Sequence, residues 1–296
     1  EDDTVTDAPS KGNDEGIFGY GHDGSKTATT NLVSNAGVVS SDVTGVGTTR
    51  NYPAATEFGG DKGIFGFGNA DSGVTGVTNL VSNAGVVATD VSAVGTARRS
   101  LAGCRYGTDT AIFGFGHTTG VVGMTNLVSD AGVVASDVTA VGTARRDLAA
   151  CEYGEDKGIF GFGDTGSYTG ITNLVSNAGV VASDTAAVGT ASAGLAACGY
   201  GYDKGIFGYG YEAAPSSGTN LVSNVGVVSS DVTGVGTARY HLAACEYGGD
   251  KGIFGFGGDT SSSLSMTNLV SNAGVVATDV TGVGSARNSL AACSFN

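Results

Sequence analysis

The sequence predicts an all-β protein built as a six-bladed β-propeller, with four antiparallel strands in each blade. The first observation is a repeat. The segment Ile-Phe-Gly-(Phe/Tyr)-Gly occurs six times at steps of 47 or 48 residues, starting at Ile17, Ile64, Ile112, Ile159, Ile206 and Ile253. A period of roughly 20–50 residues is typical of solenoids and propellers.

The second observation is the spacing inside each repeat. A Thr-Asn-Leu-Val-Ser segment follows each Ile-Phe-Gly, with its asparagine 14 or 15 residues after the isoleucine. The next Ile-Phe-Gly always begins 33 residues after that asparagine. All variation in length therefore lies in the short stretch between the two segments.

The third observation is that no stretch has the 3.6-residue period of a helix. The repeat over 148–191 predicts a first strand (148–153), a hairpin turn (154–158), a second strand (159–163), a variable loop (164–171), a third strand (172–176), a turn (177–179) and a fourth strand (180–184). The glycines of the second strand indicate close approach of another backbone.

The domain organisation follows from the repeats. Residues 1–11 are expected to be an N-terminal tail and residues 12–296 a single propeller. The C-terminal segment 290–296 repeats the first-strand pattern, whereas no such pattern precedes Ile17. We therefore expect 290–296 to complete the first blade and to close the ring, which hides edge strands.

Composition excludes several classes of protein. Glycine contributes 52 of 296 residues without a Gly-X-Y period, so collagen is excluded, and the 41% hydrophobic residues recur in fixed positions, as in a folded chain. The net charge of −14 opposes binding to nucleic acid, and no apolar run approaches the roughly 20 residues of a membrane span. No motif for a metal or a cofactor is present, so none is expected.

Three kinds of side chain recur in fixed positions. The five cysteines are expected to be free, buried thiols, because equivalent positions of neighbouring blades lie too far apart for disulfides. Aspartates in the first hairpin turn are expected to be turn residues; these are Asp61, Asp156, Asp203 and Asp250. A second set of aspartates is followed by an arginine eight residues later in most repeats; the aspartates are Asp42, Asp90, Asp137, Asp184, Asp231 and Asp279.

Two interpretations of this second set are open. A ring of acids is able to form a funnel for cations, whereas a residue repeated in every blade more often builds the blade. We expect each aspartate to cap a turn or to pair with the arginine of its own repeat, which fixes the linker between blades. Ser192 replaces that arginine in the fourth repeat, so Asp184 is expected to lack this partner.

The segment Thr143-Ala-Arg145, followed by 148–163, resembles the kelch motif, in which an arginine precedes a small-residue strand, a turn and a strand ending in glycines. The resemblance covers all six repeats and implies a propeller with the first strand innermost. The tryptophan of the kelch fourth strand is missing, and only Gly257-Gly258 gives the full diglycine. The repeats also resemble those of uncharacterised viral and environmental proteins.

The variable positions are the best candidates for function. The loop between strands two and three and the linker to the next blade emerge on one face, and rigid scaffolds commonly bind through such loops. The candidate ligand-binding residues are His22, Asp23, Asn69, Asp71, Arg99, His117, Arg146, Asp164, Tyr168, Tyr211, Glu212, Tyr240, His241 and Asp259. Drift of an unconstrained surface is the competing explanation.

No catalytic motif is present, and the three histidines share no local pattern, so no enzyme is expected. The sequence favours a non-enzymatic binding or scaffold module for a protein or glycan partner. The alternative is a structural subunit of an extracellular or virion assembly, such as a filament, a fibre or a capsid decoration. A propeller enzyme and an engineered repeat ring without a ligand are the less favoured interpretations.

Overall fold

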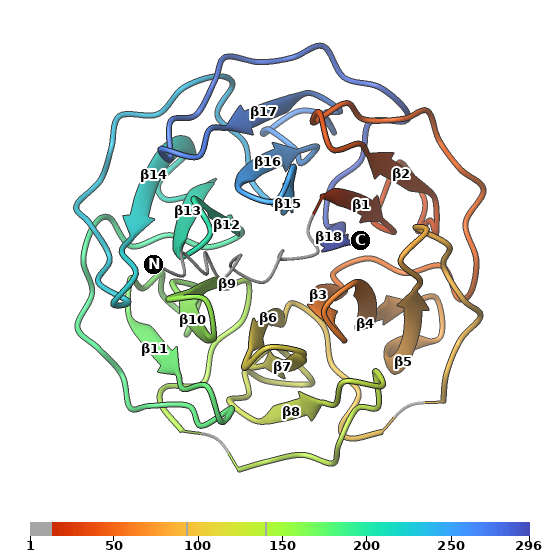
Figure 1. The fold of residues 1–296 in the computed structure, drawn as a ribbon, viewed down its shortest axis with the longest axis horizontal. Helices are drawn as coiled ribbons and strands as arrows, with labels where there is room; N and C mark the ends of the chain where they lie inside the picture. Colours follow the sequence, from red (N-terminus) through yellow and green to blue (C-terminus); the bar gives the residue numbers. More distant parts are fainter. Residues whose placement is uncertain (1–13, 93, 140) are drawn as a thin grey trace, which may run out of the picture.

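The structure, a computed structural model, describes residues 14–92, 94–139 and 141–296, so the predicted tail 1–11 lies outside the described residues. Its regular elements are strands, which form six three-stranded antiparallel sheets. Figure 1 shows the sheets around a common axis, each with its first strand nearest the centre. This arrangement is propeller-like and all-β, as the sequence predicts.

We number the sheets 1 to 6 in the order of their second strands. Sheet 1 contains β18 (Ala291–Phe295), β1 (Glu15–Gly19) and β2 (Thr30–Val33); sheet 2 contains β3 (Ala54–Phe58), β4 (Lys62–Ala70) and β5 (Gly73–Val81); sheet 3 contains β6 (Ala102–Tyr106), β7 (Thr110–Gly114) and β8 (Thr125–Val128). Sheet 4 contains β9 (Ala149–Tyr153), β10 (Lys157–Gly161) and β11 (Thr172–Val175); sheet 5 contains β12 (Ala196–Tyr200), β13 (Lys204–Tyr211) and β14 (Pro215–Val222); sheet 6 contains β15 (Ala243–Tyr247), β16 (Lys251–Gly255) and β17 (Thr267–Val270).

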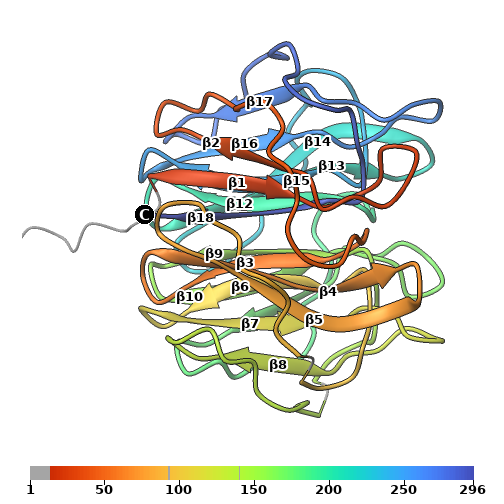
Figure 2. The same cartoon turned by 90° about the vertical axis from the view of Figure 1, so that its right-hand side faces the viewer.

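The two ends of the described chain share sheet 1. The C-terminal strand β18 pairs with β1 in antiparallel register, with Cys293 opposite Ile17. β18 and β1 lie side by side in both views (Figures 1 and 2). The segment 290–296 therefore supplies the inner strand that the first repeat lacks.

The expected fourth strand is an edge segment with two isolated bridges. In sheet 4 this segment forms one bridge between Val181 and Val175 of β11 and a second between Thr185 and Thr172 of β11. Between the two bridges, the edge segment advances by four residues where β11 advances by three. The extra residue makes a bulge, and the Asn173 side-chain amide fills the gap by donating to the Ala182 carbonyl at 3.0 Å. A side chain thus replaces part of the ladder, and each sheet has three regular strands among the described residues.

Glycines admit side chains of the neighbouring sheet. A Cβ on Gly161 would lie 2.7 Å from Cζ of Phe207 in sheet 5, and the same contact recurs at Gly19 with Phe65. The predicted approach of a backbone is therefore wrong for Gly161, where an aromatic ring makes the contact, but it is confirmed for Gly163, where a Cβ would lie 2.7 Å from the Arg146 carbonyl oxygen. The rings belong to the apolar clusters that join each sheet to the next.

The five cysteines are buried and free, as predicted. Each sulfur packs against the glycine that precedes an Ile-Phe-Gly segment in the following sheet. A Cβ on Gly158, for example, would lie only 2.5 Å from the Cys104 sulfur. Burial raises the pKa of the Cys104 thiol to about 12, so this group is an uncharged packing element at neutral pH.

Two closed cycles of backbone hydrogen bonds encircle the axis, one at each end of the inner strands. We call the first cycle the mouth ring; its members are Tyr52, Ser100, Asp147, Gly194, His241 and Ser289. Each member donates its backbone N–H to the carbonyl oxygen of the member that precedes it around the ring, at N–O distances of 2.7 to 3.1 Å. At the opposite end, the donors are Gly59, Gly107, Gly154, Gly201, Gly248 and Asn296, and each bonds to the following sheet.

The repeated aspartates join sheets rather than capping turns alone. Asp137 of sheet 3 accepts hydrogen bonds from the backbone and hydroxyl of Thr96, which precedes that sheet, and faces Arg98 at 4.0 Å. The predicted pairing with the arginine eight residues later was therefore wrong. Each aspartate except Asp231 faces the arginine of the preceding repeat, so Asp184 has Arg145 nearby.

Ser192 consequently deprives the aspartate of sheet 5, Asp231, of an arginine partner. The hairpin aspartates lie in turns, as predicted. Asp156, for example, also accepts a hydrogen bond from Asn177 at 3.0 Å.

Candidate functional site

The two variable sets meet at one end of the sheets, as predicted. In each linker, the two residues after the arginine position differ between repeats and form a variable pair; the pairs are 51–52, 99–100, 146–147, 193–194, 240–241 and 288–289. The first residue of each variable loop bridges the first residue of one such pair. Examples are Arg99 with His117, Arg146 with Asp164, and Tyr240 with Gly258. The second residue of each pair belongs to the mouth ring and has a positive φ, from 50° at His241 to 65° at Gly194. The side chains that differ between repeats therefore surround the mouth of the central channel.

Five rings form a continuous chain of edge contacts across this face, which we call the aromatic arc. The centroid of Tyr168 lies 6.0 Å from that of Tyr211, which lies 5.2 Å from Tyr240. Tyr240 contacts His241 at 4.9 Å, and His241 contacts Tyr52 at 5.1 Å. Residues from a loop of sheet 4, from the end of β13 in sheet 5 and from the linkers into sheets 6 and 2 thus build one surface.

A glycine determines where the His241 side chain lies. A Cβ on Gly194 would meet the His241 ring at 2.8 Å, so the absence of a side chain at this mouth-ring position leaves room for the imidazole. The ring reaches across Gly194, and Nε2 lies 3.8 Å from Oδ1 of Asp147. Burial lowers the pKa of His241, and the nearby Asp147 carboxylate opposes that shift.

A charged cluster flanks the arc. The Arg146 guanidinium donates to Asp164 at 2.9 Å and lies 3.6 Å from Asp147. Burial and the positive charges of Arg146 and Arg99 lower the pKa of His117. The pKa of Asp164 also lies below its ordinary value: burial opposes this shift, but hydrogen bonds from the Gly166 N–H and from Arg146 outweigh it.

Arg99 connects this cluster to the arc, because its guanidinium lies 5.7 Å from the Tyr52 ring centroid.

The other predicted residues contact neighbouring loops and linkers and lie outside the aromatic arc and its charged flank. Asp23 and Asp259 accept hydrogen bonds from serines of their own loops. Asp71 pairs with Lys26 of the preceding loop at 3.4 Å, and its side chain is exposed. The remaining three are His22, which bridges Asn288; Asn69, which bridges Asn51; and Glu212, which lines a pocket beside β13 and β14.

Two members of the site were absent from the predicted set. Tyr52 and Asp147 occupy the second position of the variable linker pair, as His241 does. The alignment of the six repeats could have identified them, because this position carries a different side chain in most repeats. Its contacts across the ring depend on the closed geometry of the mouth ring, which local sequence does not reveal.

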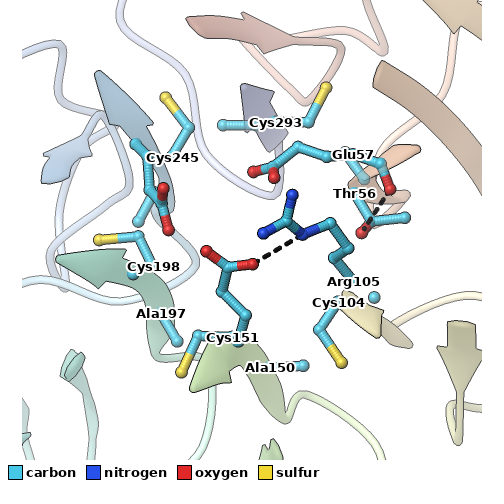
Figure 3. A pocket seen from close by; sticks show the side chains of 17 residues that line it. Thr56, Glu57, Cys104, Arg105, Ala150, Cys151, Ala197, Cys198, Cys245 and Cys293 are labelled. Carbon is cyan, nitrogen blue, oxygen red and sulfur yellow. Dashed lines mark hydrogen bonds and ion pairs between the residues drawn. The ribbon is translucent and has the colours of Figure 1, made fainter. Parts of the chain in front are cut away.

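The central channel is lined by the first strands, and Figure 3 shows Glu57 and Arg105 pointing toward its centre while the cysteine sulfurs point away from it. Arg105 donates to Glu152 at 2.8 Å, and both side chains are buried. The cavity measures about 60 Å³, enough for only a few water molecules. A substrate or sugar does not fit in this part of the channel.

Comparison with protein-family models and with curated proteins gave no match for this chain. Within residues 14–92, 94–139 and 141–296, no helix is long and apolar enough to cross a membrane. In the same part of the chain, no three His, Cys, Asp or Glu side chains are grouped so that they could hold a metal ion.

Proposed function

We propose that this protein is a non-enzymatic binding module that presents the aromatic arc and its charged flank to a protein or glycan partner. The observation that carries the proposal is the continuity of the arc, since four edge contacts join side chains that differ from repeat to repeat. Tyrosine and arginine are the side chains that most often dominate binding energy at interfaces.

A protein partner is favoured over a glycan. Sugars bind best to exposed faces of aromatic rings, but most rings of the arc are half-buried and pack edge to face. Tyr168 is the most exposed of them, with 43% of its surface accessible. The charge of −14 favours a partner with a basic contact surface.

A catalytic role receives less support from the same geometry. His241 and Asp147 come from different sheets at the channel mouth, as expected of an enzyme site, but their 3.8 Å separation exceeds hydrogen-bond reach. We therefore keep the non-enzymatic assignment.

The proposal includes the finer architecture. We propose a six-bladed kelch-like propeller in which the edge segment serves as the fourth strand of each blade and β18 closes the ring. The innermost position of the first strands and the pairing of β18 with β1 support this description.

The binding face can be tested with defined probes. Peptide and glycan libraries would be screened for ligands of the wild-type protein, and their affinities would be measured for Tyr211→Ala and Tyr240→Ala. Loss of a central tyrosine is expected to weaken binding by about 2 kcal/mol, roughly 30-fold. Tyr202→Ala is the matched control, because Tyr202 is an exposed tyrosine in the hairpin turn at the opposite end of sheet 5. Ligands that bind both arc variants as tightly as the wild type would contradict the proposal.

A structural subunit of a larger assembly is the second candidate. One valine in each edge segment is exposed at its outer rim, with 63–65% of its surface accessible; these are Val38, Val86, Val133, Val180, Val227 and Val275. Apolar side chains repeated around a circumference suit lateral packing against other molecules. Sedimentation of the wild type and of a variant with these six valines changed to threonine would test this, because an assembly of rims would dissociate in the variant.

A further inference from the structure

Five of the six linkers insert an arginine into the same kind of site. Arg98 donates from Nε to the Phe115 carbonyl at 2.8 Å, from Nη1 to the Thr96 carbonyl at 3.1 Å and from Nη2 to Asn126 Oδ1 at 2.7 Å. Its guanidinium carbon lies 4.3 Å from the Phe67 ring centroid. The site therefore combines three hydrogen-bond acceptors with an aromatic ring, as planar guanidinium groups require.

Arg239 repeats this full set of bonds, whereas Nε of Arg50 and Nη2 of Arg145 and Arg287 have no hydrogen-bond partner among the described residues. Arg239 makes the corresponding bonds to the carbonyls of Phe256 and Thr237 and to Asn268, at 2.8, 3.0 and 2.7 Å. Arg98 and Arg239 are both completely buried, and each faces a carboxylate at 4.0 Å.

The linker into sheet 5 has the same surroundings without the arginine. Ser192 occupies the arginine position, and the corresponding acceptors are the Tyr209 and Thr190 carbonyls and Asn220 Oδ1. Asn220 is 8% exposed, whereas the equivalent asparagines of the other five sheets are 0% exposed. Its Nδ2 donates to Ser229 and Asp231, and Oδ1 receives no hydrogen bond from the described residues.

A pocket of about 470 Å³ opens at this place. Its lining includes Thr190, Tyr209, Asn220 and Asp231, which are four of the five positions that contact the arginine elsewhere. The fifth is the aromatic ring, here Phe162, which is buried and is not among the residues that line the pocket. Glu212 from the adjoining variable loop adds a second carboxylate. The pocket thus offers the Asn220 amide oxygen and negative charge, in a volume typical of ligand sites.

We propose that the Ser192 pocket binds a guanidinium group carried on an alkyl chain, supplied by a small guanidino compound or by an arginine side chain of a peptide. The ligand places its guanidinium where the chain's own arginine lies in the other five linkers. Asn220 Oδ1 and the Tyr209 and Thr190 carbonyls accept its N–H groups, and Asp231 faces its charge. This site adjoins the aromatic arc, because Glu212 follows Tyr211 in the chain, but it does not depend on the proposed partner there.

Agmatine tests the small-molecule source and the capped peptide Gly-Arg-Gly tests the peptide source. Titrations followed by calorimetry and by NMR should show saturable binding that shifts the Asn220 side-chain amide resonance. 1,5-Diaminopentane, which has an ammonium in place of the guanidinium of agmatine and the same net charge, should bind at least several-fold more weakly. The two ligands are distinguished by affinity, since only a pocket open to the peptide backbone binds Gly-Arg-Gly as tightly as agmatine.

Ser192→Arg is the decisive variant, because it restores the side chain present in the other five linkers. It should weaken agmatine binding at least tenfold and raise the melting temperature, whereas Ser192→Ala, the matched control, should bind as the wild type does. Equal binding to Ser192→Arg, or no saturation of the wild type at millimolar agmatine, would overturn the proposal. Shifts in the wild type that map away from Asn220 and Thr190 would overturn it as well, independently of how any variant folds.

Discussion

The cysteine and glycine of neighbouring sheets form a contact whose energy can be measured. Cys104 of β6 packs against Gly158 of β10, and a Cβ on Gly158 would lie 2.5 Å from the sulfur and 3.0 Å from the Arg105 carbonyl. Ordinary van der Waals contact begins at 3.4 Å, so Gly158→Ala forces a displacement of about 0.9 Å at the sulfur. Overpacking of this kind costs about 1–3 kcal/mol.

The compensating change removes the sulfur. Cys104→Ala alone loses a buried group of about the size of a methylene, which costs about 1 kcal/mol. In the double variant the new methyl group occupies the space that the sulfur leaves, so we expect a coupling energy of about 1–2 kcal/mol in favour of the pair.

Urea unfolding of the wild type, both single variants and the double variant measures this coupling, provided that the m-values agree. Gly120→Ala is the control for the effect of alanine on the unfolded chain, because a Cβ there meets no atom within 4 Å. A coupling energy below about 0.3 kcal/mol, the usual error of additivity, would refute the steric explanation.

Three further predictions concern the ring and its charges. Deletion of 290–296 removes the inner strand of sheet 1, so thermal melting should lose its cooperativity or shift strongly downward; an unchanged melt would exclude closure by β18. Because the pKa values of His117 and His241 are lowered, the unfolded chain binds protons more readily, and the free energy of unfolding should fall as pH drops below about 6.5. Calorimetry should show a flatter profile when both are changed to glutamine. Asp137 faces a buried arginine and Asp231 faces none, so Asp137→Asn should lower the free energy of unfolding by about 1 kcal/mol more than Asp231→Asn does. Equal losses in chemical denaturation would contradict this role of the ion pair.

The repeat period was sufficient to predict the sheets, their strand order and the common face of the variable loops. The sequence predicts a regular fourth strand, because valines recur in that segment. The structure has an irregular edge segment instead, because the Asn173 side chain forms a hydrogen bond in place of part of the backbone ladder, and this could not be predicted. The arginine partner of each repeated aspartate could not be predicted either. Every repeat carries the same residue types, so the sequence does not distinguish a contact within a repeat from one with the preceding repeat, and only Ser192 breaks the symmetry.

The candidate site was likewise predictable only in part. Variation between repeats located Tyr211, Tyr240 and His241, but the contact of His241 with Tyr52 passes over the intervening Ser289 and exists only in a closed ring. Contacts between side chains from non-adjacent sheets depend on ring diameter, which no local pattern encodes.

The mouth ring has an electrostatic consequence. Its six N–H groups and carbonyls point along the circumference, each toward the neighbouring sheet. Peptide dipoles of about 3.5 D that follow one another around a closed ring cancel as vectors, whereas those of a helix add along its axis. The ring therefore leaves almost no net field at the mouth, and its carbonyls are not directed inward like those of an ion-selective filter. The potential that an approaching molecule meets there is set by the side chains, and hence by the positions that differ from one repeat to the next.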